Sequence, residues 1–149
     1  DLVGRKTSRD GGRTARAVAS RIEATEAELA ARGSVACRAM ARRLKAAREA
    51  FLDAVDFVCS QSKSSPNAVF AGSVPYLMLT GTLVAGWQMA RALMAAEERL
   101  AEGTDAEFMR AKIVTARFYA DHILNKAASL RDSIVEGADA VTDLALESF

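Results

Sequence analysis

Apolar residues recur every three or four positions along most of the chain, a spacing typical of helices that bury one side. The first such stretch runs from about residue 13 to 31, and the second from 35 to 61. Gly33 suits the left-handed end of the first helix, and Ser34 can cap the second. The second helix has a continuous apolar stripe over about six turns, formed by Cys37, Met40, Leu44, Ala47, Phe51, Val55 and Val58.

The residues from 64 to 90 contain no charged side chain. Residues 63–67 predict a loop, and Ser73 is the expected N-cap of a third helix that ends at Gly103. A helix that is apolar all round is normally buried. We therefore expect either the central helix of the fold or a helix whose second apolar face meets another subunit. The apolar core of this run is interrupted by polar residues and ends in a charged turn, so no membrane span is predicted.

Gly81 and Gly86 lie within this third helix, where they remove side-chain bulk. We expect them to let a neighbouring helix approach closely.

A fourth helix is predicted from a capping box in which Thr104 and Glu107 satisfy each other's backbone amides. Its apolar positions alternate steps of four and three, as in a helical bundle: Met109, Ile113, Ala116, Ala120, Ile123, Ala127, Leu130 and Ile134. We expect this seam to be buried and the helix to end at Gly137. The segment 138–149 could add one short helix.

Four long helices with short connections predict an all-α fold, an antiparallel four-helix bundle with a short extra C-terminal helix. Residues 13–149 are expected to form this bundle domain. Residues 1–12 contain three glycines among charges, and an irregular lead-in from a preceding domain is expected there.

Charge is distributed unevenly along the chain, although the net charge is only +1. Residues 1–50 carry 12 Lys and Arg against 6 Asp and Glu, and residues 51–149 carry 8 against 13. This asymmetry indicates either two solvated surfaces of different charge or a basic end that faces an acidic partner or an anion. The basic cluster on the second helix has neither the charge excess nor the aromatic platform of a nucleic-acid site, so no nucleic-acid partner is predicted. The cluster comprises Arg38, Arg42, Arg43, Lys45 and Arg48.

Residues that could carry chemistry are few. His122 is the single histidine, and it is expected on a helix surface. Cys37 and Cys59 fall on the same predicted helix about six turns apart, so they cannot pair within it. Reduced thiols and a polar opening segment with no apolar leader fit a cytoplasmic location. No phosphate loop, dinucleotide fingerprint or paired-carboxylate metal motif is present, so we expect no catalytic, cofactor-binding or metal residues in the chain.

Three stretches resemble the C-terminal helical extension of a bacterial branch of the acyl-CoA dehydrogenase family. The likeness covers nearly the whole sequence. The segments that carry it run from Asp1 to Lys6, from Val74 to Gly81 with Gly86-Trp87, and from Ala111 to His122. In that branch a Tyr-Glu-Gly type stretch, which carries the catalytic base and residues that hold the flavin, comes before the region that this sequence resembles. The sequence departs from the family at Asn125-Lys126, where a proline-containing pair is expected.

The resemblance implies a parent enzyme that binds FAD and removes the α and β hydrogens of an acyl-CoA thioester, within fatty acid metabolism. None of that machinery matches a residue of this sequence, so the chain itself is expected to be a non-catalytic accessory and oligomerisation domain without a flavin. Its expected partners are its own N-terminal dehydrogenase domains and further copies of itself in a homo-oligomer. The alternative from the sequence is a stand-alone helical protein-interaction module with no enzyme activity.

The charge-free run is the best candidate for an interface, because one helix cannot bury every face in a simple bundle. We expect the interface to include some of the residues Phe70, Tyr76, Leu77 and Trp87, and an isolated domain to associate as a two-fold dimer. The opposite possibility is that all four lie in the core of a single chain.

Overall fold

The computed structural model describes residues 1–143 and 146–148, and within them all regular structure is helical. The elements in chain order are η1 (Leu2–Thr7), α1 (Arg13–Arg32), α2 (Val35–Gln61), α3 (Pro66–Ala71), α4 (Ser73–Ala101), α5 (Ala106–His122), η2 (Leu124–Lys126), α6 (Ala127–Val135), α7 (Ala138–Thr142) and η3 (Leu146–Ser148).

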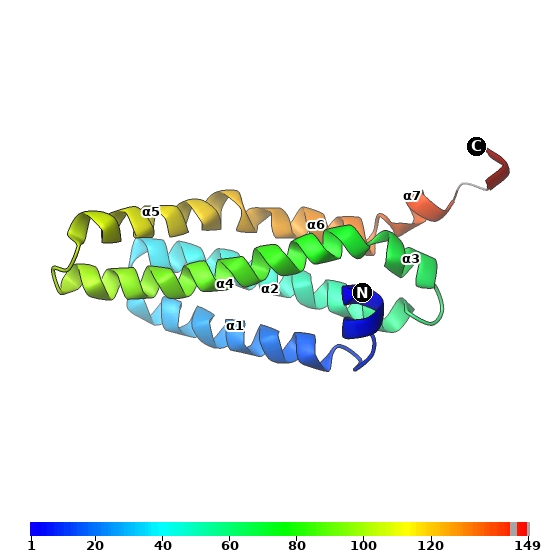
Figure 1. Ribbon diagram of the computed structural model, residues 1–149, viewed down its shortest axis with the longest axis horizontal. Coiled ribbons are helices and arrows are strands. Elements are labelled where there is room, and N and C mark those ends of the chain that lie inside the picture. The colour runs from blue at the N-terminus through cyan, green and yellow to red at the C-terminus, as the bar shows by residue number, and fades with distance from the viewer. Residues whose placement is uncertain (144–145, 149) are drawn as a thin grey trace.

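Four long rods lie side by side and alternate in direction: α1, α2, α4, and α5 continued by α6 (Figure 1). The helix α2 contacts α1, α4, α5 and α6. The helix α4 contacts α1, α2, α5 and α6. The predicted all-α antiparallel four-helix bundle is therefore confirmed.

Local chemistry at the first hairpin explains where two of the rods begin and end. Gly33 adopts a left-handed conformation with φ of 73°, which glycine reaches without steric cost. The Ser34 hydroxyl then accepts a hydrogen bond from the Cys37 amide at 3.0 Å and satisfies one free donor of α2. Both assignments agree with the sequence prediction.

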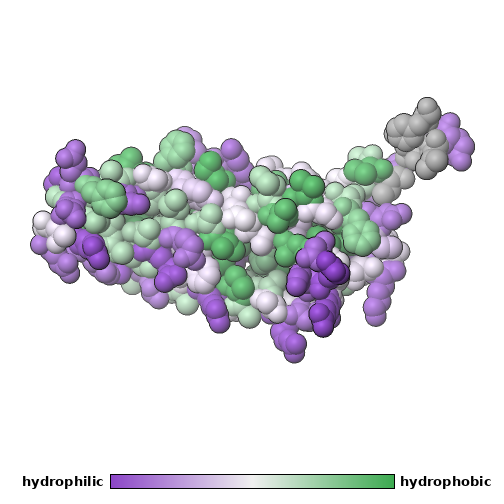
Figure 2. Space-filling model, in the orientation of Figure 1, coloured by the Kyte–Doolittle hydropathy of each residue, from purple (hydrophilic) through white to green (hydrophobic). Residues whose placement is uncertain are grey.

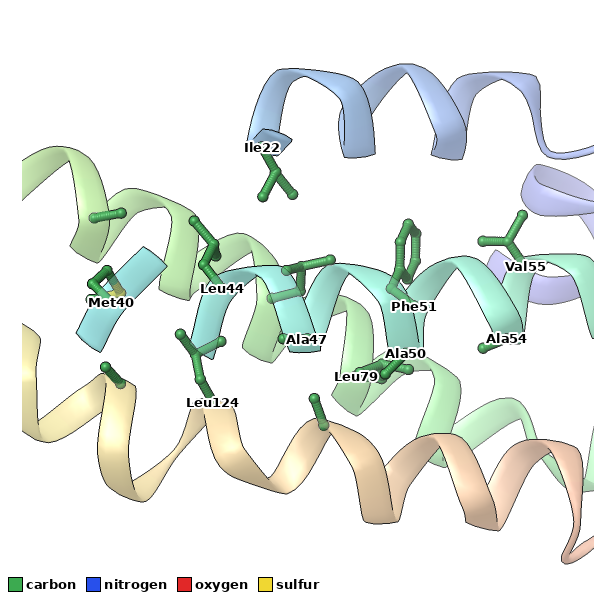
Figure 3. Close-up of a cluster of buried hydrophobic side chains, with 14 of the residues drawn as sticks. Ile22, Met40, Leu44, Ala47, Ala50, Phe51, Ala54, Val55, Leu79 and Leu124 are labelled. Carbon is green, nitrogen blue, oxygen red and sulfur yellow. The ribbon is translucent and has the colours of Figure 1, made fainter. Parts of the chain in front are cut away.

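The core runs the length of the bundle and centres on α2, whose apolar stripe is buried (Figure 3). Met40, Leu44, Ala47 and Val55 have essentially no exposed surface. Ile22 from α1 and Leu79 from α4 close over this stripe. Such all-round contact between rods is what gives a chain of this size a stable interior.

The predicted fourth helix is wrong in two details. No side chain caps α5, which follows Asp105 in a left-handed conformation with φ of 46°, so the predicted capping box does not form. The rod is also interrupted, because α5 ends at His122 and a 3₁₀ turn, η2, precedes α6.

At the interruption the buried position is one residue later than predicted. Leu124 is buried and Ile123 is only partly buried, which reverses the predicted pattern. A 3₁₀ turn has three residues per turn instead of 3.6, so it rotates the apolar face. Of the predicted seam, Ile113 and Leu130 are also only partly buried, whereas five positions are fully buried: Met109, Ala116, Ala120, Ala127 and Ile134.

The segment before α1 is not irregular. Residues Leu2–Thr7 form a π-helical turn whose Val3 and Thr7 are buried against the bundle. The loop expected at 63–67 is shorter than predicted, because Pro66 begins the short helix α3. The predicted C-terminal helix is split into α7 and the turn η3, and the parts of 138–149 at residues 144, 145 and 149 lie outside the described residues.

Candidate docking surface

One side of α4 is apolar and exposed, although the other side is buried in the bundle. Leu77 and Met78 lie three and four residues after Val74, and Val84 lies seven after Leu77, a spacing that keeps these residues on one side of a helix. Phe70 of α3 extends the same surface. We call this surface the α4 face, defined by Phe70, Val74, Leu77, Met78 and Val84, which are 36–70% exposed.

The α4 face is broad and shallow. Gly81 lies in its middle and is exposed, and a Cβ at this position would meet nothing within 4 Å. Figure 2 shows apolar side chains over the α3 end of α4, next to the hydrophilic side chains around the N-terminus. The helix α4 is therefore not apolar and buried all round, and the first of the two expectations for it, a fully central helix, is wrong.

A groove of about 630 Å³ adjoins the α4 face, between η1, α1 and α4. Its interior is apolar and is lined by Leu2, Val18, Phe51, Leu83 and Val84. Its rim is mainly basic and carries Arg5, Lys6, Arg9 and Arg13 with one carboxylate, Asp10. We call this feature the N-terminal groove. An apolar floor with a charged margin is the usual make-up of a surface that binds a partner.

The turn η1 is fixed to α4 by a buried hydrogen bond. The hydroxyls of Thr7 and Tyr76 lie 2.9 Å apart, and both side chains are buried. Burial raises the pKa of the Tyr76 hydroxyl, so it stays neutral in this contact. The backbone at Gly4 also approaches the Phe70 ring, because an ideal Cβ there would lie 3.3 Å from Phe70 Cε1. The N-terminal residues therefore lie at the edge of the α4 face.

The four predicted interface residues divide into two pairs. Phe70 and Leu77 are exposed members of the α4 face. Tyr76 is only 1% exposed and belongs to the core, so it is removed from the candidate interface. Trp87 is partly buried, and its indole Nε1 donates to the Thr25 hydroxyl at 2.8 Å. Because Phe70 and Leu77 are exposed, the four residues do not all lie in the core.

The sequence prediction missed three members of the α4 face, Val74, Met78 and Val84. All three fall inside the charge-free run from 64 to 90, so the signal was present. What the run alone could not reveal was which apolar positions face the bundle.

The basic cluster on α2 is largely engaged within the chain. The Arg48 guanidinium makes two hydrogen bonds to the Glu26 carboxylate, at 2.8 and 3.0 Å. Arg43 contacts Asp121 at 3.5 Å, and Lys45 contacts Glu49 at 3.9 Å. These partners neutralise much of the charge that a phosphate backbone would need.

Side chains with possible catalytic roles lie apart from one another. His122 is exposed, as expected, and its ring stacks on Phe118 with centroids 4.5 Å apart. Cys37 is buried, and its thiol donates to Glu97 at 3.2 Å; burial raises the pKa of this thiol. Cys59 lies near the other end of α2 and is also a free thiol. Across the described residues, no three His, Cys, Asp or Glu side chains are grouped to hold a metal ion.

The first turn of α1 is not free to bind a phosphate group. Gly11 and Gly12 precede α1 with positive φ, but the first turn of this helix is already occupied by a carboxylate of the chain itself. Asp10 Oδ2 accepts from the Thr14 amide at 3.0 Å and from its hydroxyl at 2.5 Å. A diphosphate placed there would meet a like charge instead of free amides.

No helix in the described part of the chain combines the length and apolar character needed to cross a bilayer.

Comparison with known proteins gives the class of this bundle. The family model described as "Acetyl-CoA dehydrogenase C-terminal like" matches residues 18–145. The chain therefore belongs to this family and is a C-terminal domain of an acyl-CoA dehydrogenase. It is 45% identical over 146 residues to the 3-methylmercaptopropionyl-CoA dehydrogenase of Ruegeria pomeroyi. That match covers 98% of this chain but 25% of the relative, so the chain spans about a quarter of the relative's length.

Proposed function

We propose that this domain is the non-catalytic accessory and oligomerisation domain of an FAD-dependent acyl-CoA dehydrogenase. The whole protein would remove the α and β hydrogens of an acyl-CoA thioester, and the flavin and the catalytic base would belong to the remainder of the polypeptide. The observation that carries the proposal is a self-contained bundle with an exposed apolar face, and its described residues contain no group of His, Cys, Asp and Glu that could hold a metal ion.

In this proposal the domain acts by packing against other parts of the enzyme. A cofactor supplies the redox chemistry of a flavoenzyme, and the protein supplies orientation and exclusion of water. The α4 face gives the domain a surface with which to contact other parts of the enzyme, because contiguous exposed apolar patches usually mark partners. Assembly of the whole enzyme as a homo-oligomer and a cytoplasmic location are further parts of the proposal. The free thiols of Cys37 and Cys59 are consistent with a reducing compartment.

The test compares the whole dehydrogenase with residues 1–149 alone, both purified and checked for helical content. The whole protein should show flavin absorbance and should reduce an artificial electron acceptor when given an acyl-CoA. The thioester named for the relative, 3-methylmercaptopropionyl-CoA, is one substrate to try among a series of acyl chains. Residues 1–149 alone should be colourless and inactive. Stoichiometric flavin in the isolated domain, or a whole protein without flavin or turnover, would contradict the proposal.

A further inference from the structure

We propose that the α4 face and the adjoining N-terminal groove form one surface that docks on the dehydrogenase portion of the same polypeptide. This inference rests on the proposed function, and it specifies which side of the bundle makes the contact. It also specifies the chemistry of the opposing surface, which should have an apolar centre and an acidic margin.

The first argument is the lack of a partner within the bundle. Val74, Leu77 and Met78 are each more than half exposed, although they belong to a helix whose other side is fully packed. Removing such side chains from water stabilises a contact by roughly 25 cal/mol for each Å² buried. With Phe70 and Val84 they form a continuous surface along α3 and the first half of α4.

The second argument is the position of the chain's first residues. The turn η1 contacts α2, α3 and α4, and Thr7 is hydrogen-bonded to Tyr76 in the middle of this region. The preceding dehydrogenase portion would therefore join the bundle at the edge of the α4 face. Covalent attachment raises the effective concentration of the attached portion, to the millimolar range where the linker is short. This favours the attached portion over a second copy of the domain as the occupant of the face.

The third argument is charge. Arg5 on the groove rim is paired with Asp1 at 2.6 Å, and Arg13 is attracted by the Asp10 carboxylate, whereas Lys6 and Arg9 form no ion pair with a described residue. The rim cations lie beside an apolar floor, where an opposing carboxylate would be partly shielded from water and hence attracted more strongly. The basic end of the chain would thus face an acidic partner, one of the two interpretations of its charge asymmetry.

The experiment measures thiol labelling in the whole dehydrogenase. One variant carries Val74→Cys, and the matched control carries Val114→Cys on α5, which is not a member of the α4 face and lines a separate pocket with Val35 and Phe118. These valines are 70% and 67% exposed in the bundle, so the introduced thiols start from equal accessibility. A bulky maleimide is added to the native protein, and labelling of each position is followed by peptide mass spectrometry, which separates these sites from native cysteines.

We expect the thiol at position 74 to react about tenfold more slowly than the thiol at position 114, because docking must open before the reagent can enter. Equal rates would overturn the proposal. Protection at position 74 that is lost on dilution would also overturn it, because a second copy of the chain would then be the occupant. Flavin content and turnover are measured on the same samples. Equal labelling rates in an active, flavin-containing enzyme would contradict the proposed docking surface alone. Protein without flavin or turnover would contradict the proposed function.

A second variant tests the acidic margin. Arg9→Glu combined with Arg13→Glu, added to Val74→Cys, should speed labelling several-fold because the rim would then repel the opposing carboxylates. The control is Arg99→Glu in the same background, which reverses an exposed charge at the opposite end of α4. Equal labelling rates in the rim variant and this control would show that the margin of the opposing surface is not acidic.

Discussion

The side chain of Leu124 occupies the space that a side chain at position 86 would need. An ideal Cβ on Gly86 would lie 2.6 Å from Leu124 Cδ2, and Leu124 itself is buried. The absence of a side chain at this position lets η2 pack directly on the backbone of α4. The close approach expected from the sequence is therefore present at Gly86, whereas Gly81, the other candidate, faces open space.

These two glycines give a matched test of packing. Gly81→Ala should stabilise the domain by about 0.5–1 kcal/mol, because alanine favours the helix and meets no obstacle. Gly86→Ala should destabilise it by about 1–2 kcal/mol, because the cost of displacing Leu124 exceeds the gain in helix propensity. Denaturant unfolding followed by circular dichroism measures both. Equal shifts in the same direction would show that Leu124 does not fill the space beside Gly86.

The register of the interrupted rod can be tested with two neighbouring residues. Leu124→Asp should lower the free energy of unfolding by about 3–5 kcal/mol, since it places an unpaired charge in the core. Ile123→Asp should cost only about 1–2 kcal/mol, because that side chain keeps partial access to water. A continuous helix with the seam predicted from the sequence requires the opposite order. Thermal melts of the two variants decide between the registers.

In this rod the sequence alone does not determine which of two neighbouring residues is buried. The positions of Ile123 and Leu124 are both apolar, so the pattern accommodates either one as the buried residue. In the structure the 3₁₀ turn begins at Leu124, whose side chain packs on Gly86 of another helix. By contrast, Gly33 and Ser34 act within one turn of the chain, and their roles were predicted correctly. The local signals at this hairpin were sufficient, whereas the capping box predicted from Thr104 and Glu107 does not form.

Which apolar residues of α4 are exposed was only partly predicted, for the same reason. Tyr76 and Leu77 are adjacent in an apolar run, yet one is buried and the other exposed. The hydroxyl partner of Tyr76 is Thr7, which is 69 residues away and lies in a segment expected to be irregular. Periodicity gives the angle between two side chains on a helix, but the tertiary packing determines which of them points inward.

The ion pair between α1 and α2 gives a third prediction. The side chains of Glu26 and Arg48 are each 10% exposed, and Glu26→Gln would leave the Arg48 charge without its bidentate partner. We expect a loss of about 3 kcal/mol, as is usual when one member of a buried pair is removed. The matched control is Glu23→Gln, which removes a second, longer contact to Arg48 from an exposed side chain. It should change stability by no more than about 0.5 kcal/mol.

Thiol titration gives a prediction with a defined dependence on pH. Burial raises the pKa of the Cys37 thiol, and burial likewise raises that of Cys59. The reactive thiolate is therefore scarcer at neutral pH in the folded domain than in the unfolded chain, and its fraction increases only at higher pH. Cys37 should resist a thiol reagent in the native state, and both cysteines should react once guanidinium is added. Rapid native labelling of Cys37 would contradict its burial.

The last prediction concerns the domain without the rest of the enzyme, in which the α4 face would have no partner. Residues 1–149 alone should self-associate through this face, most simply as a two-fold dimer in which each copy covers the other. Leu77→Glu should abolish association because it places a charge in the centre of the contact, whereas Val114→Glu should leave it unchanged. Sedimentation at micromolar concentration measures the mass of each variant. Trp87 should not respond to dilution, because its indole is held inside one copy by Thr25. A monomeric wild-type domain would show that the exposed apolar area is too small to bind a second copy, and association that persists in Leu77→Glu would place the dimer contact elsewhere.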